Sequence, residues 1–360
     1  MPEKSFAGVL KEKYFLSILF LITLACAFSY PYRQLAMWIA FMLAAYSAIA
    51  NDSIQTIGTF IAANSHRKWY YLWLYMGGIF VATVTYSWIT YGGDVSYQRL
   101  ANKGLNEAPT AFSFLQVFSP AILLILTRLR MPVSTSILLL SAFSTKSSSI
   151  VSILQKSFFG YFLAFLSAIL VWMLISNLFE KNKHKSPSGY WVPFQWLTSG
   201  LLWSVWIMQD AANVAVVLPR SLSTAQFLFF TTFIFGGLGL LFYLKGDKIQ
   251  SIVEEKSDVK DVRAATIVNL VYALLLYYLK WVSTIPISTT WVFIGLLGGR
   301  ELAISIRTMS GSERGRAIQR SLKLIRKDVL YAAIGLLVSL LLAFSINDAM
   351  RENLFRSLRF

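Results

Sequence analysis

An aspartate flanked by amide side chains occurs twice inside long apolar stretches of the sequence. The first copy consists of Asn51, Asp52 and Gln55, and the second, 158 positions later, of Gln209, Asp210 and Asn213. A carboxylate with amide oxygens is a hard-oxygen ligand set that suits Na⁺, and a carboxylate alone can carry H⁺. We therefore predict that Na⁺ binds at Asp52 and Asp210, with a polar clasp between the two stretches as the alternative. The full predicted cation site is Asn51, Asp52, Gln209 and Asp210.

A proline followed by hydroxyl side chains also occurs twice. Pro132 lies 80 positions after Asp52, and Pro286 lies 76 positions after Asp210. A proline at the first turn of a helix leaves the next backbone N–H groups free at the positive end of the helix dipole. Hydroxyl donors at such a helix end can bind a tetrahedral oxyanion, although ordinary helix capping uses the same residue types. The predicted anion-binding residues are Ser134, Thr135, Ser136, Ser288, Thr289, Thr290, Gln55 and Asn213.

The two kinds of motif follow each other in the same order and at nearly the same spacing, which indicates an internal repeat. The apolar segments pair in the same way, from 35–63 with 193–218 through to 157–179 with 328–347. Each repeat holds five segments, so if all of them cross a membrane the second repeat enters it from the opposite side. Inverted repeats with sites on broken helices near the midplane are typical of secondary transporters.

The composition places these motifs in a membrane protein. Of the 360 residues, 56% are apolar and only 14% are charged, against about 25% charged in an ordinary soluble domain. The apolar runs are 14–30, 35–63, 69–91, 110–127, 132–153, 157–179, 193–218, 224–244, 264–283, 286–306 and 328–347. Several reach the roughly 20 residues that a bilayer requires. We predict an all-α polytopic membrane protein with about eleven transmembrane segments, two inverted five-segment repeats, and broken or re-entrant helices.

The distribution of basic residues predicts the orientation. The chain carries 33 Lys and Arg against 17 Asp and Glu, a net charge of +16. If the N-terminus is cytoplasmic and every segment crosses, the inside loops hold 22 Lys and Arg and the outside loops hold 10. Cytoplasmic loops carry the excess of Lys and Arg, so the bias favours an internal N-terminus and an external C-terminus. It also explains the net charge without a nucleic-acid partner.

This layout divides the chain into five parts. They are an N-terminal accessory helix at 1–34, a first repeat at 35–180, a cytoplasmic linker at 181–192, a second repeat at 193–347 and a C-terminal tail at 348–360. The expected location is the cell's inner (plasma) membrane, which the chain crosses several times in contact with the lipid bilayer. A homodimer is one possible assembly.

Other polar and small residues are assigned structural roles. Glu301 adjoins Arg300 inside a segment, and we expect the two to satisfy each other. The pairs Gly236-Gly237 and Gly298-Gly299 are expected to mark close helix packing. A single cysteine and two histidines exclude a disulfide framework and argue against a Cys/His metal site.

At the paired motifs the chain resembles the inorganic phosphate transporter (PiT) family, which also includes sulfate permeases. That family carries two copies of a Gly-x-Asn-Asp-x-x-Asn-x signature and two Pro-x-Ser-Thr-Thr-type motifs on inverted repeats. Here a glutamine, Gln55 or Gln209, replaces one amide of each signature, and the glycine before each signature is absent. The histidine common after the second motif pair is Ile137 or Trp291. The resemblance spans residues 35–347 and is carried by four motifs in order.

The resemblance implies cation-coupled uptake of an inorganic anion, with the motif residues lining a central site. We therefore expect a secondary active symporter for phosphate, coupled to Na⁺ or alternatively to H⁺, and no enzymatic activity. A sulfate permease is the runner-up, but phosphate can donate a hydrogen bond to Asp52 or Asp210 and sulfate at neutral pH cannot. A passive anion channel and an intramembrane aspartyl enzyme with these aspartates as a dyad are further alternatives.

Overall fold

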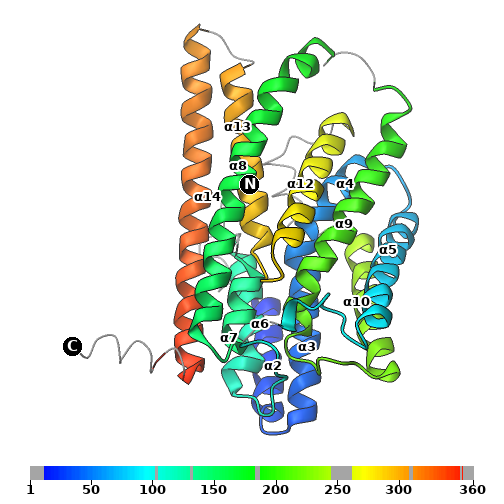
Figure 1. Cartoon of the computed structure of the whole chain (residues 1–360), viewed down its shortest axis with the longest axis vertical. Coiled ribbons are helices and arrows are strands. Elements are labelled where there is room, and N and C mark those ends of the chain that lie inside the picture. The colour runs from blue at the N-terminus through cyan, green and yellow to red at the C-terminus, as the bar shows by residue number, and fades with distance from the viewer. Residues whose placement is uncertain are drawn as a thin grey trace, which may run out of the picture.

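The computed structural model describes residues 12–101, 104–129, 133–182, 187–244, 262–307, 311–348 and 351. Within these ranges the chain forms helices, turns and loops, with no strand, so the prediction of an all-α chain is confirmed (Figure 1). Several predicted features lie outside the described residues. They are Pro132, most of the loop at 245–263, residues 1–11 of the accessory helix, residues 183–186 of the linker and nearly all of the C-terminal tail.

Six helices in the described part of the chain are long and apolar enough to cross a membrane. They are Arg33–Asp52, Trp69–Thr90, Ser147–Ser176, Thr224–Tyr243, Val262–Val282 and Arg314–Ile346. Large apolar side chains also cover their outer surface; Leu166 and Leu174, for example, are 62% and 70% exposed. Such an outer surface suits lipid rather than water, which indicates a membrane protein.

The first half of the chain contains helices of very different lengths. In chain order they are α2 (Lys13–Ser29), α3 (Arg33–Ser47), the π-helical turn η1 (Ala48–Asp52), α4 (Ser53–Ala63), α5 (Trp69–Thr90), the short turn η2 (Arg99–Ala101), α6 (Phe114–Arg128), the π-helical turn η3 (Ser136–Leu140), α7 (Ser141–Phe143) and α8 (Ser147–Asn182). In Figure 1, α3 and α4 rise through the molecule, α5 descends, and α8 rises along its full length. Between them, α6 contacts η3 and α7 in the lower half.

The predicted segments at 132–153 and 157–179 are wrong in their boundaries. The first helical stretch ends at Phe143, and α8 then runs without a break from Ser147 to Asn182. The polar run that begins at Ser144 explains the division, because the Ser144 hydroxyl donates to the Lys146 carbonyl and stabilises a turn instead of a helix. The first of the two segments is therefore a short helix in contact with α6, and only α8 is long enough to cross.

The second half follows the opposite course. Its helices are α9 (Trp191–Ala215), α10 (Thr224–Tyr243), α12 (Val262–Val282), α13 (Thr289–Arg307) and α14 (Gly311–Ile346). In Figure 1, α9 descends, α10 rises, α12 descends to about the middle of the molecule, α13 returns upward, and α14 descends along its full length. The basic run 307–327, which lies between two of the predicted segments, lies mainly within α14.

The α13 helix packs closely on α8 because glycines let the two backbones approach. A Cβ atom on Gly295 would overlap the carbonyl oxygen of Tyr161, and one on Gly299 would overlap that of Phe165. The prediction of close packing is therefore confirmed at Gly299. Of the other predicted pair, Gly237 lies close against the Ile49 side chain, whereas Gly236 has open space where its Cβ would be.

Candidate functional site

The two aspartates lie at special positions of buried helices. Asp52 is the last residue of the π-helical turn η1, where α3 gives way to α4, and Asp210 lies near the end of α9. Their exposed fractions are 1% and 2%. Single π-helical turns inside helices are frequent at functional sites, since they interrupt the regular backbone hydrogen bonding. The helix from Arg33 to Ala63 is therefore irregular at the first motif but not interrupted, and α9 runs through the second motif without the break expected of a broken helix.

Asp210 is bound by side chains from both halves of the chain. Its Oδ1 accepts from Asn213 Nδ2 at 2.8 Å and from the Ser136 hydroxyl at 3.3 Å. Its other oxygen, Oδ2, accepts a short hydrogen bond from the Thr289 hydroxyl. The second aspartate motif thus holds together both Ser/Thr segments, one from each half of the chain.

Asp52 has a smaller set of partners. Its Oδ1 accepts from Asn51 Nδ2 at 2.7 Å, and the Thr135 hydroxyl lies beside the same carboxyl. The Asp52 and Asp210 carboxyls are close enough to interact electrostatically. From the same motif, Gln55 Nε2 donates to the Thr290 hydroxyl at 3.3 Å, which links the first motif to the second Ser/Thr segment.

The two Ser/Thr segments bind each other reciprocally. The Ser136 hydroxyl donates to the Ile287 carbonyl at 2.9 Å, and the Thr290 hydroxyl donates to the Val133 carbonyl at 3.4 Å. Ser136 and Thr290 occupy the same place in their motifs, as do Val133 and Ile287. Each segment therefore makes the same contact with the other, as two copies related by a twofold axis would.

The first serine of each Ser/Thr segment is a helix cap. Ser134 Oγ accepts from the backbone N–H of Ile137 at 3.1 Å, and Ser288 Oγ accepts from that of Trp291 at 3.2 Å. The capping alternative therefore holds for these two hydroxyls, whose acceptor capacity is used by their own helices. The remaining four hydroxyl residues of the predicted site are Thr135, Ser136, Thr289 and Thr290.

Several buried acceptor oxygens at the site have no hydrogen-bond partner. They are the amide oxygens Gln55 Oε1, Gln209 Oε1 and Asn213 Oδ1. The amide nitrogens of the same side chains are engaged; Gln209 Nε2, for instance, donates to the Leu276 carbonyl at 2.9 Å. A buried acceptor without a partner is costly, so a surplus of them indicates a place for a cation. Carboxylate and amide oxygens are hard ligands, which suit an alkali cation.

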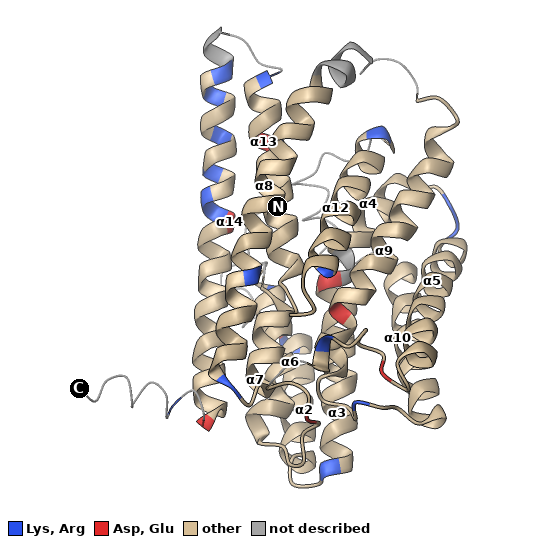
Figure 2. Ribbon diagram, viewed as in Figure 1, with Lys and Arg blue, Asp and Glu red and all other residues tan. Residues whose placement is uncertain are grey.

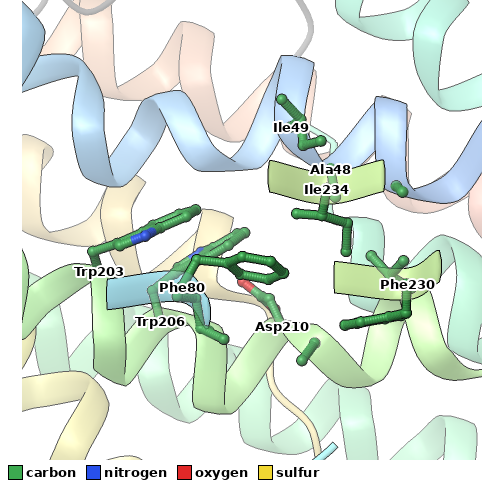
Figure 3. A pocket seen from close by; sticks show the side chains of 12 residues that line it. Ala48, Ile49, Phe80, Trp203, Trp206, Asp210, Phe230 and Ile234 are labelled. Carbon is green, nitrogen blue, oxygen red and sulfur yellow. The ribbon is translucent and has the colours of Figure 1, made fainter. Parts of the chain in front are cut away.

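Asp210 borders a small apolar cavity on another side (Figure 3). The cavity lies between α3, η1, α5, α9 and α10, and its volume is about 40 Å³. Trp203, Trp206, Phe80 and Phe230 contribute aromatic rings, and Asp210 is the one charged residue in its lining. Apart from Asp210 and the indole N–H groups of Trp203 and Trp206 the lining is apolar, so the cavity offers few donors for an anion.

Arg99 is a residue of the site that sequence reasoning missed. It begins the short turn η2 in the loop between α5 and α6, yet it is only 1% exposed and its charge acts on Asp210. Burial lowers the pKa of its guanidinium to about 10, which leaves it charged at neutral pH. From the sequence, Arg99 is one of the basic residues of a loop. The nearby Gly92-Gly93-Asp94 is typical of a tight turn, and it is the one local feature that indicates an ordered loop.

Other expectations can be compared with the structure directly. Arg300 Nη1 donates to Glu301 Oε1 at 2.8 Å, so the expected pairing is confirmed. The twelve predicted cation- and anion-binding residues all lie in described parts of the chain, on four segments. When the chain is compared with protein-family models, with curated proteins and with solved structures, none of the three comparisons finds a match.

Proposed function

We propose that this protein is a secondary active transporter that couples the uptake of a tetrahedral oxyanion, most favourably phosphate, to the entry of Na⁺. One observation carries the proposal: Asp210 accepts hydrogen bonds from Ser/Thr segments of both halves of the chain, in a site with surplus buried acceptor oxygens. A site shared by two halves that can shift against each other is the arrangement that alternating access requires.

We infer that the two halves are inverted repeats. The order α3 to α4, α5, α6, η3 to α7 and α8 matches the order α9, α10, α12, α13 and α14. Each half then holds five segments, of which the third and fourth form a re-entrant hairpin and three cross the membrane. Three is an odd number, so the second half enters from the opposite side. The opposite courses of α3 and α9 in Figure 1 and the reciprocal hydrogen bonds support this reading.

In this proposal the cation binds first. The candidate ligands are the Asp52 and Asp210 carboxylates with the partnerless amide oxygens of Gln55, Gln209 and Asn213. Na⁺ suits such oxygen ligands. It also offsets the free-energy cost of burying two negatively charged carboxylates, because Arg99 supplies a single positive charge near them. A proton taken up by one carboxyl is the alternative coupling ion.

The anion then binds to donors that the cation releases. Thr289 donates its hydroxyl proton to Asp210, and Ser136 shares its single hydroxyl proton between Asp210 and the Ile287 carbonyl. Once a cation neutralises Asp210, these hydroxyls can turn toward an anion at the adjoining N-termini of η3 and α13, where backbone N–H groups and the helix dipole add to them. Coupling follows because the anion donors become available only when the cation is bound.

Uptake into proteoliposomes tests the proposal. Labelled phosphate should accumulate above its external concentration only with an inward Na⁺ gradient, and unlabelled sulfate should compete weakly. Stronger competition by sulfate than by phosphate would identify a sulfate permease instead. Equilibration without accumulation in every ion gradient would indicate a passive channel and contradict the proposal.

A further inference from the structure

Arg99 connects the α5–α6 loop to the tip of the α12–α13 hairpin. Its Nη1 donates to three consecutive carbonyls at that tip, those of Ser283, Thr284 and Ile285, at 3.2, 3.3 and 3.0 Å. Its Nε donates to the carbonyl of Met208 on α9, two residues before Asp210, at 3.3 Å. One side chain therefore joins three separate parts of the molecule beside the candidate cation site.

The loop that carries Arg99 has a defined conformation that directs this side chain inward. Asp94 Oδ1 accepts from the backbone N–H of Ser96 at 2.8 Å, and Oδ2 accepts from that of Gln98 at 2.6 Å. Tyr97 and Gln98 have φ angles of 54° and 59°, a left-handed conformation that is unfavourable for such side chains. Two adjacent residues in this conformation are maintained only where the surrounding contacts determine them.

Hydrogen bonds to neighbouring parts of the protein hold the same loop in place. The Leu222 N–H donates to the Gly93 carbonyl at 2.9 Å, and the Trp88 indole donates to the Leu222 carbonyl at 2.8 Å. The Thr145 N–H donates to the Gly104 carbonyl at 2.8 Å. These hydrogen bonds attach the loop to the α9–α10 and α7–α8 connections. They therefore fix the position of the backbone that carries Arg99.

The outer side of the hairpin tip is exposed. Trp281, near the end of α12, is 80% exposed, and Thr284 is exposed as well. Directly after the tip come Pro286, Ile287 and the Ser/Thr segment that binds Asp210. The contact with Arg99 therefore lies at the point where a displacement of the tip would pull Thr289 away from Asp210.

An arginine at a helix C-terminus often does no more than satisfy free carbonyls. That role would account for the bonds to residues 283–285, but it does not require the bond to Met208 or a place within range of the Asp210 charge. We propose that Arg99 is a positioning residue: it latches the α12–α13 hairpin to α9 beside Asp210, and the hairpin leaves the site only when this latch opens. The purpose of that motion rests on the proposed transport function, but the latch itself can be tested without transport.

The reactivity of a cysteine introduced at a buried position just after the hairpin tip tests the proposal. Cys26 is the single cysteine of the chain, so a Cys26→Ala background carries one reporter, Ile287→Cys, at a position that is 2% exposed. The purified protein in detergent is treated with N-ethylmaleimide, and labelling is expected to be slow. Adding Arg99→Gln removes the charged donor and should accelerate labelling about tenfold or more. Arg99→Lys keeps the charge but lacks the planar fork, and should give a smaller acceleration.

Arg220 provides the matched control. Burial lowers the pKa of its guanidinium to about 10 as well, and it donates to the carbonyls of Leu105, Glu107 and Leu218, but none of its hydrogen bonds reaches the hairpin tip. Because Leu105 and Glu107 belong to the loop that carries Arg99, Arg220→Gln weakens the attachment of the loop but keeps the Arg99 bonds to the tip, and it should accelerate the labelling of Ile287→Cys much less than Arg99→Gln does. Equal acceleration by Arg220→Gln and Arg99→Gln, or a rate within twofold of the parent in Arg99→Gln, would overturn the proposal.

The native Cys26 reports general loosening of the structure. It is fully buried, and in Arg99→Gln with Ile287 intact it should remain unlabelled. If Cys26 reacts, Arg99→Gln has disturbed the whole fold, and the test then depends on Arg99→Lys. In that case, unchanged labelling of Ile287→Cys in the Arg99→Lys variant would contradict the latch. Fast labelling of Ile287→Cys in the parent would also contradict a latched hairpin. Because the assay contains no substrate and no transport step, its outcome is independent of whether the protein transports phosphate.

Discussion

At the scale of single residues, the hydroxyl side chains of the two Ser/Thr segments have different tasks. Ser134 and Ser288 cap their helices, whereas Ser136 and Thr289 donate to Asp210. Both kinds of residue look alike in the sequence. Their hydrogen bonds distinguish the hydroxyl groups that cap helices from the hydroxyl groups that can donate to an anion.

We expect Thr289→Val to lower phosphate affinity about tenfold or more, because it removes one hydroxyl donor to a charged ligand and keeps the shape. Ser288→Ala should leave that affinity within about twofold but reduce the free energy of unfolding by about 1 kcal/mol, since it removes a cap. Calorimetric titration with phosphate in Na⁺, together with thermal unfolding, measures both effects. The reverse pattern would assign the anion contact to the capping serine.

A second prediction concerns the two buried carboxylates. In the wild-type protein, Na⁺ should raise the midpoint of thermal unfolding, because a ligand at 100 times its Kd adds about 2.7 kcal/mol of stability. Asp210→Asn should abolish this response while the ion-free protein becomes no less stable, since the variant no longer buries that charge. Thermal unfolding in NaCl and in choline chloride gives the comparison. An unchanged Na⁺ response in both Asp52→Asn and Asp210→Asn would rule out the cation site.

At the scale of helices, the closest packing lies between α8 and α13. Gly295→Ala or Gly299→Ala should destabilise the protein by about 1–3 kcal/mol, because the new methyl group meets a carbonyl oxygen of α8 that cannot turn aside. Gly236→Ala is the matched control, with open space at its Cβ, and should be neutral or slightly stabilising. Thermal unfolding in detergent measures all three. Equal stability of the three variants would mean that α13 is not held against α8 in this way.

The helices also show which parts of the site the sequence could predict. The motifs were recognisable because each occurs twice, and the starts of η3 and α13 follow from proline and serine signals that act locally. The length of α8 was not predictable in the same way, because the residues around Lys156 resemble a polar break although the helix continues through them. Arg99 could not be placed, since its role depends on Met208 and on residues 283–285, which are far away in the sequence.

At the scale of the whole molecule, the charge is concentrated at one end. Figure 2 shows Lys and Arg along the upper part of α14. With 36 residues this helix is about 54 Å long, well beyond the roughly 30 Å of a hydrocarbon core, so its upper part extends out of the bilayer. The run 307–327, with its seven Lys and Arg residues, lies at this end, on the side that the positive-inside bias assigns to the cytoplasm.

Reporter fusions test this orientation. A reporter inserted in the region 310–325 should lie in the cytoplasm, and one attached after Phe360 should lie outside, because α14 separates the two positions. A phosphatase that is active only outside the cytoplasm and a fluorescent protein that matures only inside it give complementary signals. Both fusions on the same side would contradict a crossing by α14 and with it the three-crossing repeat.

The central claim is that the two aspartates couple a cation to an anion, and uptake in matched proteoliposomes tests it most directly. The measurement is the accumulation of labelled phosphate under an inward Na⁺ gradient for wild-type protein, Asp52→Asn and Asp210→Asn, reconstituted at equal amounts. We predict that the wild-type protein concentrates phosphate and that neither variant does, although both insert and remain folded. Na⁺-driven accumulation at wild-type levels in both variants would contradict the account.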